Sequence, residues 1–337
     1  MTLAAGFLFV LIGGVLQGSF ILPMTLTKKW SWEHTWGIFS LLGMLTFNWM
    51  IGLLVIPNII SVYRTVSPQQ IIILIVFGAA WGIGAILFGI GMDRLGMALG
   101  YAIIMGLTST FGALIPLVIF FPGTLCTRKG LTLLIGTVIA IGGIVLCSMA
   151  GARKRPLLGS PVHAESGDFA VGLLIAILAG IFCCLPNVGM AFGTNVILAA
   201  QAQGASKTFS SSSVWVLFFT VGFIVNFGYC FFLMVRRKKV KEYFGPNAAR
   251  NLGLGALMAI MWIGSFYLYG MGTAKLGRWG VVVGWPLFIS SSILVGNLWG
   301  IWRGEWKDAS PSAGLMLKEG LLALLIAVIT MGISNSL

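Results

Sequence analysis

The sequence predicts an all-α integral membrane protein with ten transmembrane helices, arranged as an inverted repeat of five plus five. Of its 337 residues, 58% are hydrophobic and 9% are charged, whereas a soluble domain devotes about a quarter of its residues to charge. The mean hydropathy is +1.01. A sixteen-residue phrase also recurs 181 positions further along the chain. With so few polar side chains to face water, the chain is predicted to lie in a lipid bilayer.

Ten apolar runs are long enough to cross a bilayer core, which takes about 20 helical residues. They are 3–26, 36–57, 69–92, 96–121, 130–150, 169–192, 212–235, 251–273, 278–302 and 313–335. Backbone in lipid must satisfy its own hydrogen bonds, which favours helices, and the sequence lacks the alternation of membrane-barrel strands. The first run has no charged residue before it and no clear cleavage site after it, so we interpret it as a span.

Positive charge is distributed unequally between the loops. The loops after the first, third, fifth, seventh and ninth spans hold 15 of the 21 Lys and Arg residues. The positive-inside rule places these loops in the cytoplasm and both termini in the periplasm. The run RRKKVK at 236–241 then fits a segment held at anionic headgroups rather than a nucleic-acid site. The net charge of +13 is thus mostly a topology signal.

Residues for enzyme chemistry or metal binding are sparse. The five cysteines show no zinc or haem spacing, and His34 and His163 fall in predicted cytoplasmic loops. No strand precedes a Gly-rich phosphate loop, and no nucleophile and base can be assembled in one region. The sequence therefore predicts a protein that is not an enzyme and has no metal or cofactor.

The recurring phrase reads WGIGAILFGIGMDRLG at 81–96 and WIGSFYLYGMGTAKLG at 262–277. The offset aligns Trp81 with Trp262, together with three glycines, a leucine and a basic residue. Each copy is predicted to join the end of one span to the start of the next. Five spans separate the copies, so they cross the membrane in opposite directions, as in the inverted repeats of many secondary transporters.

The repeat predicts the domain organisation. Residues 1–150 form the first five-helix repeat, 151–168 a cytoplasmic linker, and 169–337 the second, inverted repeat. The linker has the polar composition, with Pro and Gly, that is typical of a join between two halves. Two such halves can rock about a midplane site and expose it to either side of the membrane in turn.

Four further stretches read KKWSWE at 28–33, FGAAWGIG at 77–84, RLGMALG at 94–100 and GEW at 304–306. Together they resemble the L-rhamnose–proton symporters, a family in the ten-helix branch of the drug/metabolite transporter superfamily. The resemblance extends from the first cytoplasmic loop to the last. It implies ten helices, an inverted five-plus-five repeat, a bacterial inner membrane location, and sugar uptake driven by protons.

The chain departs from the pattern of that family in two spans. The family has Asn residues after WGIG, where this chain has Ala85 and Leu87, and it has a Gln and a His where this chain has Ser265 and Thr273. An unpaired polar group in a dry pocket costs about 1–3 kcal/mol. Fewer amides therefore favour a sugar other than L-rhamnose, or a less polar solute.

Two other function classes remain open. A facilitator or exporter of another small metabolite with the same fold is the alternative to proton-coupled uptake. A membrane scaffold or sensor that transports nothing should carry a soluble domain or a long tail, whereas almost every residue here belongs to a span or a short loop. The expected partners are a small sugar, protons and the lipid bilayer, with no nucleic acid.

Proton coupling has no obvious carrier in the sequence. No Asp, Glu or His falls at a predicted midplane, where a proton relay is expected. Asp93 lies at the repeated turn and is predicted to form a cytoplasmic cap or ion pair. Glu33 is predicted to form a loop ion pair with Lys28 or Lys29.

The substrate site is predicted to consist of neutral polar and aromatic side chains, because aromatic rings stack on sugar rings and amides bind hydroxyl groups. Gln17 lies six residues before Pro23 in the first span, and Asn187 follows Pro186 in the corresponding sixth span. Prolines at matched positions predict interrupted spans near the site. The predicted substrate-binding residues are Gln17, Trp81, Tyr101, Thr108, Asn187, Trp262, Ser265 and Tyr269. For each aromatic residue, helix packing is the alternative interpretation.

Overall fold

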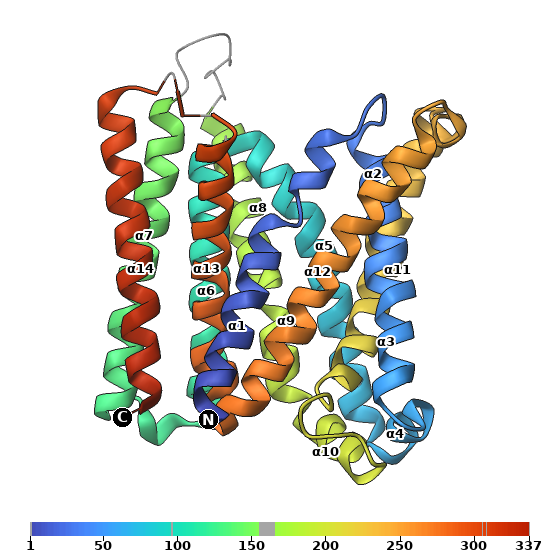
Figure 1. The fold of residues 1–337 in the computed structure, drawn as a ribbon, viewed down its shortest axis with the longest axis vertical. Coiled ribbons are helices and arrows are strands. Elements are labelled where there is room, and N and C mark those ends of the chain that lie inside the picture. The colour runs from blue at the N-terminus through green and yellow to red at the C-terminus, as the bar shows by residue number, and fades with distance from the viewer. Residues whose placement is uncertain (1, 96, 155–165, 305, 308, 337) are drawn as a thin grey trace. The chain divides into compact units, whose positions relative to one another are not determined.

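The computed structural model describes residues 2–95, 97–154, 166–304, 306–307 and 309–336 (Figure 1). In this part of the chain every regular element is a helix. Ten helical segments in it are long and apolar enough to cross a membrane. The predicted all-α, ten-span architecture is therefore confirmed, and the chain is a multi-pass membrane protein.

The spans follow the predicted order. Those of the first half are α1 (Thr2–Ser19) with η1 (Leu22–Leu26), then α2 (Trp32–Phe39) with η2 (Ser40–Phe47) and α3 (Asn48–Val55), then α5 (Pro68–Leu95), α6 (Met97–Phe120) and α7 (Arg128–Lys154). Those of the second half are α8 (Ser166–Cys183) with α9 (Leu185–Phe192), then α11 (Ser212–Arg236), α12 (Ala248–Leu276), α13 (Gly280–Trp302) and α14 (Pro311–Ser336). Short helices fill the connections: α4 (Ile59–Thr65), η3 (Pro122–Thr124), α10 (Thr194–Ala202), η4 (Val240–Phe244) and η5 (Gly277–Trp279).

The first and sixth spans are interrupted at their prolines, as predicted. The helix α1 ends at Ser19, and Pro23 lies in the 3₁₀ turn η1. The helix α8 ends at Cys183, and Pro186 lies in the first turn of α9. Proline has no backbone N–H to donate and is accommodated at the start of a helix, where that donor has no intrahelical partner.

The second span begins four residues earlier than predicted, which corrects the placement of two ionisable residues. Ser31 is extended at φ −75° and ψ 166°, and α2 begins directly after it. Glu33 and His34 thus lie in the first helical turn and are buried, so the prediction of a loop position for His34 is wrong. The ion-pair partner of Glu33 is Arg237, rather than the predicted Lys28 or Lys29.

Two other predictions about ionisable residues concern atoms outside the described part of the chain. They are the cytoplasmic cap or ion pair of Asp93, whose side chain is not described, and the loop position of His163.

The middle of the second span is a π-helix, which the sequence did not predict. The π-helical segment is η2, and within it the Thr46 hydroxyl donates to the carbonyl oxygen of Leu41, five residues earlier. Asn48 follows it directly, and its side-chain amide donates to the carbonyl oxygens of Met44 and Trp215. Helices of this wider form occur mostly as short insertions at functional sites.

The chain divides into two compact units, and each takes segments from both halves of the sequence. Unit 1 contains Met1–Ile83 and Gly189–Lys275, and unit 2 contains Gly84–Val188 and Leu276–Leu337. These units describe packing, whereas the predicted division into repeats describes symmetry, so the repeat boundaries stay a prediction. Most of the predicted linker lies outside the described residues, between the end of α7 and the start of α8.

Within unit 2, the helices α7 and α14 pack side by side and antiparallel (Figure 1). A Cβ atom on Gly143 would lie 3.0 Å from the carbonyl oxygen of Gly320, and one on Gly136 would lie 3.5 Å from that of Ala327. The contacts thus move toward the end of α14 as they move toward the start of α7. Glycines let the two backbones approach closely, as is typical of helix pairs in membranes.

Candidate functional site

An aromatic cluster fills the interior of unit 1 and contains both tryptophans of the repeated phrase. The rings of Trp81 on α5 and Trp262 on α12 are stacked, with centroids 5.8 Å apart and an interplanar angle of 20°. Trp262 also contacts the rings of Phe39, Phe219 and Phe266 at centroid distances of 5.3, 4.7 and 5.1 Å. Trp81 is 7% exposed and Trp262 is 3% exposed. The two aligned tryptophans thus lie together, whereas their role in a substrate site stays a prediction.

Two glycines on neighbouring helices make room for these rings. A Cβ atom on Gly222 of α11 would lie 2.5 Å from the Trp81 ring, and one on Gly43 of η2 would lie 3.4 Å from the Trp262 ring. The indole N–H groups of Trp81 and Trp262 have no hydrogen-bond partner among the described residues. These two rings therefore offer two N–H donors among mainly aromatic side chains.

Gln17 and Ser265 form the polar part of the predicted site in unit 1. The Ser265 Oγ atom lies 2.8 Å from Gln17 Oε1 and 2.6 Å from the carbonyl oxygen of Trp262. A serine hydroxyl has one hydrogen to donate, so it serves one of these two acceptors. If the Ser265 hydroxyl donates to the Trp262 carbonyl oxygen, the Gln17 side-chain amide can be flipped by 180°. Its N–H group then donates to Ser265 Oγ. Ser265 is fully buried and Gln17 is half-buried, so Gln17 keeps amide atoms free for a ligand hydroxyl.

Tyr269 is also in unit 1 and fully buried on α12.

Sequence reasoning missed two polar pairs that lie in the same unit. The Tyr267 hydroxyl lies 3.0 Å from the carbonyl oxygen of Asn48 and 3.1 Å from its Oδ1 atom. The Trp36 indole donates to Asn226 Oδ1 at 3.1 Å. Both asparagines stand inside apolar runs, and that placement was the signal that could have identified them.

The three remaining predicted residues, Tyr101, Thr108 and Asn187, belong to unit 2. The Asn187 amide donates to the carbonyl oxygens of Gly112 and Val281, each at 2.7 Å, and thereby joins α9 to α6 and α13. The Thr108 hydroxyl donates to the carbonyl oxygen of Gly180 at 3.2 Å.

Tyr101 contacts Phe88 edge to face at a centroid distance of 6.3 Å. The side-chain donors of Asn187 and Thr108, by contrast, are already bonded to backbone carbonyl oxygens. The predicted residues fall into a unit 1 set and a unit 2 set, and each set is described by itself.

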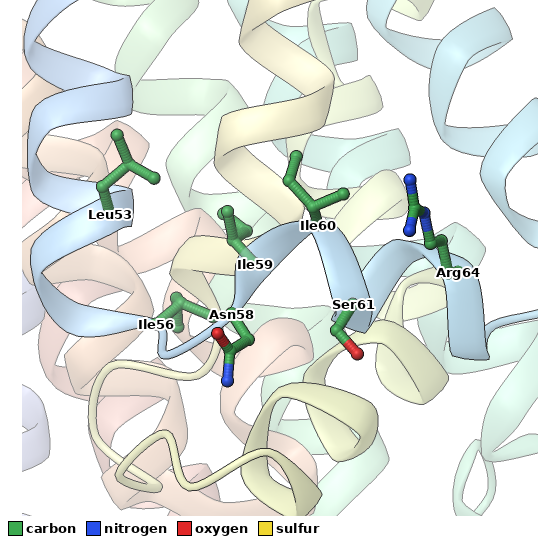
Figure 2. Close-up of a pocket in the computed structure, with 7 residues that line it drawn as sticks. All are labelled: Leu53, Ile56, Asn58, Ile59, Ile60, Ser61 and Arg64. Carbon is green, nitrogen blue, oxygen red and sulfur yellow. The ribbon is translucent and has the colours of Figure 1, made fainter.

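A hollow of about 410 Å³ lies elsewhere in unit 1, at the turn between α3 and α4 (Figure 2). Its lining is Leu53, Ile56, Asn58, Ile59, Ile60, Ser61 and Arg64, which includes none of the predicted site residues. The lining is mainly aliphatic and has no aromatic ring on which a sugar could stack. We therefore place the candidate site at the aromatic cluster, on chemistry rather than on empty volume.

The groups of the candidate site are suited to binding a neutral solute. In the described part of the chain, no three His, Cys, Asp or Glu residues gather in a way that could hold a metal ion. The site in unit 1 combines stacked rings, indole donors, an amide and a hydroxyl. Such a set suits a neutral, hydroxylated solute, because its rings pack on C–H faces and its polar groups pair with hydroxyls.

Comparison with known proteins gives a consistent result over the whole length. The sequence profile of the L-rhamnose-proton symport protein family (RhaT) matches residues 1–336. An L-rhamnose-proton symporter of Escherichia coli (strain SMS-3-5 / SECEC) is 30% identical over 343 residues, which cover 98% of each chain. One of Shigella boydii serotype 18 (strain CDC 3083-94 / BS512) is 30% identical over 339 residues, which cover 97% of each chain. The chain belongs to the L-rhamnose-proton symport protein family.

Proposed function

We propose that this protein is a secondary active transporter that takes up L-rhamnose or a related sugar together with protons across the bacterial inner membrane. The observation that carries the proposal is the family match from residue 1 to residue 336, together with ten membrane spans. The candidate site supports it, because its polar groups are neutral and paired with aromatic rings, as a sugar requires.

Alternating access between two inverted repeats is the proposed mechanism. Three observations within single units support the repeat. Trp81 and Trp262, which the repeated phrase aligns, are stacked, as expected of equivalent residues that lie near a symmetry axis. The equivalent spans α7 and α14 run antiparallel. Ser109 and Ser290, also 181 positions apart, are both fully buried with hydroxyls that have no partner among the described residues.

The proposed sugar-binding surface centres on the unit 1 set of Gln17, Trp81, Trp262 and Ser265, with Tyr269 behind it. Tyr101, Thr108 and Asn187 stay proposed members from unit 2. For Thr108 and Asn187 the bonds to backbone carbonyls favour a supporting role, in which they hold α6 in place. A buried amide whose two hydrogens are already paired has little left to donate to a ligand.

Uptake of radiolabelled L-rhamnose by proteoliposomes with an imposed pH gradient tests the function. We expect accumulation above the external concentration when the interior is alkaline, and loss of that accumulation when a protonophore collapses the gradient. Equilibration without accumulation, unaffected by the protonophore, would identify a facilitator. Absence of rhamnose transport alongside transport of another solute would favour the exporter alternative.

The proposed orientation places both termini in the periplasm. Its support is the charge distribution between loops, together with two hydrogen bonds. The loop after the first span donates to Glu242 of η4 and to Asn251 in the first turn of α12, so this loop and the connection between α11 and α12 lie at the same membrane face. A phosphatase fused to the C-terminus is expected to be active in the periplasm. An active cytoplasmic reporter at that end, with a silent phosphatase, would reverse the assignment.

A further inference from the structure

The first turn of α2 carries a buried carboxylate, Glu33, beside a buried imidazole, His34. Glu33 is 1% exposed and His34 is 0% exposed. Of the other carboxylates whose side chains are described, Glu242 is partly exposed and Glu319 is exposed. An ionisable group buried in a membrane protein is costly and marks a functional site by default. No role in the sugar site described above uses either residue.

The ion pair of Glu33 is asymmetric in exposure. Arg237, just beyond the end of α11, donates from Nη1 to Glu33 Oε1 at 2.9 Å. The Arg237 side chain is 53% exposed, whereas that of Glu33 is 2% exposed. When a proton takes the place of the guanidinium, the carboxyl group becomes neutral in its buried position. The guanidinium can then turn to water, where a charge is well solvated.

The groups around Glu33 are also bonded to one another. His34 Nε2 lies 2.9 Å from the carbonyl oxygen of Lys239, and Nδ1 lies 3.0 Å from Ser31 Oγ, which can donate or accept. The Tyr243 hydroxyl donates to the carbonyl oxygen of His34 at 3.0 Å. Burial raises the pKa of Tyr243 above its ordinary range, so this donor keeps its hydrogen.

The titratable groups that face Glu33 come from three segments. They are Cys230 of α11, Arg237 after it, Tyr243 of η4 and His34 in the same turn of α2, with Lys239 and Glu242 beyond His34. Among the described residues, Arg237 is the one opposite charge in contact with the Glu33 carboxylate. It is therefore the group that competes with a proton.

We infer that Glu33 is the proton-binding residue of the transport cycle and that Arg237 is the cation that displaces the proton from it. The inference rests on the proposed proton symport. In the described form the proton has left Glu33 for water, and the carboxylate pairs with Arg237. In the loaded form one proton is bound to a Glu33 oxygen and Arg237 is released. The loops at this membrane face are those assigned to the cytoplasm, where an inward-moving proton must be discharged.

Two assays in proteoliposomes separate coupling from sugar binding. One is accumulation of L-rhamnose driven by a pH gradient, and the other is counterflow of labelled against unlabelled L-rhamnose at equal pH. Glu33→Gln keeps the shape of a protonated glutamate and cannot release a proton. We expect this variant to lose gradient-driven accumulation and to retain counterflow. Glu319→Gln, an exposed carboxylate on α14, is the matched control and should retain both.

The pH dependence of uptake by Arg237→Gln tests the inference, because loss of a purely structural ion pair would not shift it. Without the guanidinium, a proton has no competitor at Glu33, so half-maximal uptake is expected at a higher pH, by about one pH unit. If Glu33 only anchors the loop, Arg237→Gln lowers stability and leaves the pH profile in place.

Each result of these assays either supports or overturns the inference about Glu33. Gradient-driven accumulation by folded Glu33→Gln at the wild-type level overturns the inference. If Glu33→Gln does not fold, the pH profile of uptake by Arg237→Gln decides. An unshifted pH profile overturns the inference, and a shift to higher pH supports it. A wild-type protein that performs counterflow without gradient-driven accumulation contradicts the proposed symport itself. That failure is seen before any variant is made.

Discussion

The aromatic cluster of unit 1 and the α7–α14 pair of unit 2 pack helices together in opposite ways, one through large aromatic rings and the other through glycines. Both bring together elements that the proposed repeat would relate. The cluster does so with large rings and leaves the indole N–H groups of Trp81 and Trp262 unpaired among the described residues. The helix pair does so with glycines, and its contacts are backbone against backbone at Gly143 and Gly320.

We interpret this difference as one between the proposed binding surface and a structural support. Contact between glycines leaves no side chain for a solute and no room to move, which suits a rigid scaffold. A cluster of rings can exchange ring–ring contacts for ring–sugar contacts at similar cost, and its N–H groups gain partners when a sugar enters. We therefore expect substitutions in the cluster to change affinity, and substitutions in the helix pair to change stability alone.

Trp262→Ala is expected to have the largest effect and to test the comparison most directly. It removes a ring that contacts four others, and a buried Trp→Ala change typically costs about 3–5 kcal/mol of unfolding free energy. If the ring also stacks on the sugar, binding loses about 1 kcal/mol or more in addition. Both are measurable on one purified sample, as the melting temperature in detergent and the L-rhamnose affinity in counterflow.

The result for Trp262 distinguishes packing from binding. A lowered melting temperature with normal affinity in the surviving folded protein would remove Trp262 from the proposed site. Trp302→Ala is the matched control, because that side chain is 76% exposed at the end of α13. It should change neither quantity.

Gly143→Leu tests the other region, with the next largest effect. The new side chain would start 3.0 Å from the carbonyl oxygen of Gly320 and from Leu324, so α7 and α14 must separate. Overpacking of this kind costs about 1–3 kcal/mol. The neighbouring Gly142 has nothing within 4 Å, so Gly142→Leu is the control. A lower melting temperature for Gly143→Leu alone, with unchanged affinity, fits a scaffold; equal melting temperatures for both variants would contradict the close packing.

The sequence predicted the spans well because length and hydropathy decide them. It also located the breaks at Pro23 and Pro186, since a missing N–H acts locally on the helix that contains it. The π-helix η2 was not predictable, because its residues, SLLGMLTF, have no pattern distinct from an α-helix. The earlier start of α2 was missed because Ser31, the residue before it, makes no side-chain capping hydrogen bond and lies within a polar loop.

Only part of the candidate site could be predicted, because many of its contacts join residues that are far apart in the sequence. Trp81 and Trp262 could be linked because the recurring phrase aligns two residues that are far apart in sequence. No such link connects Glu33 to Arg237, which are 204 positions apart, so the sequence suggested the neighbouring lysines instead. Contacts of this kind depend on how α2 and α11 pack, and single-sequence patterns do not contain that information.

Ser265→Ala sharpens the comparison through a smaller effect. It removes the hydroxyl that bonds to Gln17 and leaves that amide with one partner fewer. A hydrogen bond of this kind contributes about 1 kcal/mol, so we expect the affinity for L-rhamnose to fall by about fivefold. Ser292→Ala is the control, since that serine bonds only to the carbonyl oxygen of Ile289 in its own helix. Equal affinities for the two variants would argue against a binding role for Gln17 and Ser265.

Tyr243→Phe is expected to have the smallest effect, and its pH dependence identifies its cause. The variant loses the bond to the His34 carbonyl oxygen, worth about 0.5–1.5 kcal/mol of unfolding free energy at neutral pH. Burial, helped by Cys230 and Glu33, raises the pKa of Tyr243 in the folded protein, whereas the unfolded chain ionises near its ordinary value of about 10. The contribution of Tyr243 is therefore complete below about pH 10 and declines above it, because ionisation then favours the unfolded chain. Phe has no such proton to lose. The difference in stability between the wild type and Tyr243→Phe should narrow as the pH rises through about 10, in denaturant titrations of the detergent-solubilised protein. A difference that stays constant up to pH values well above 10 would contradict a raised pKa of the Tyr243 hydroxyl in the folded protein, and no difference at any pH would mean that Tyr243 acts through its ring, which Phe retains.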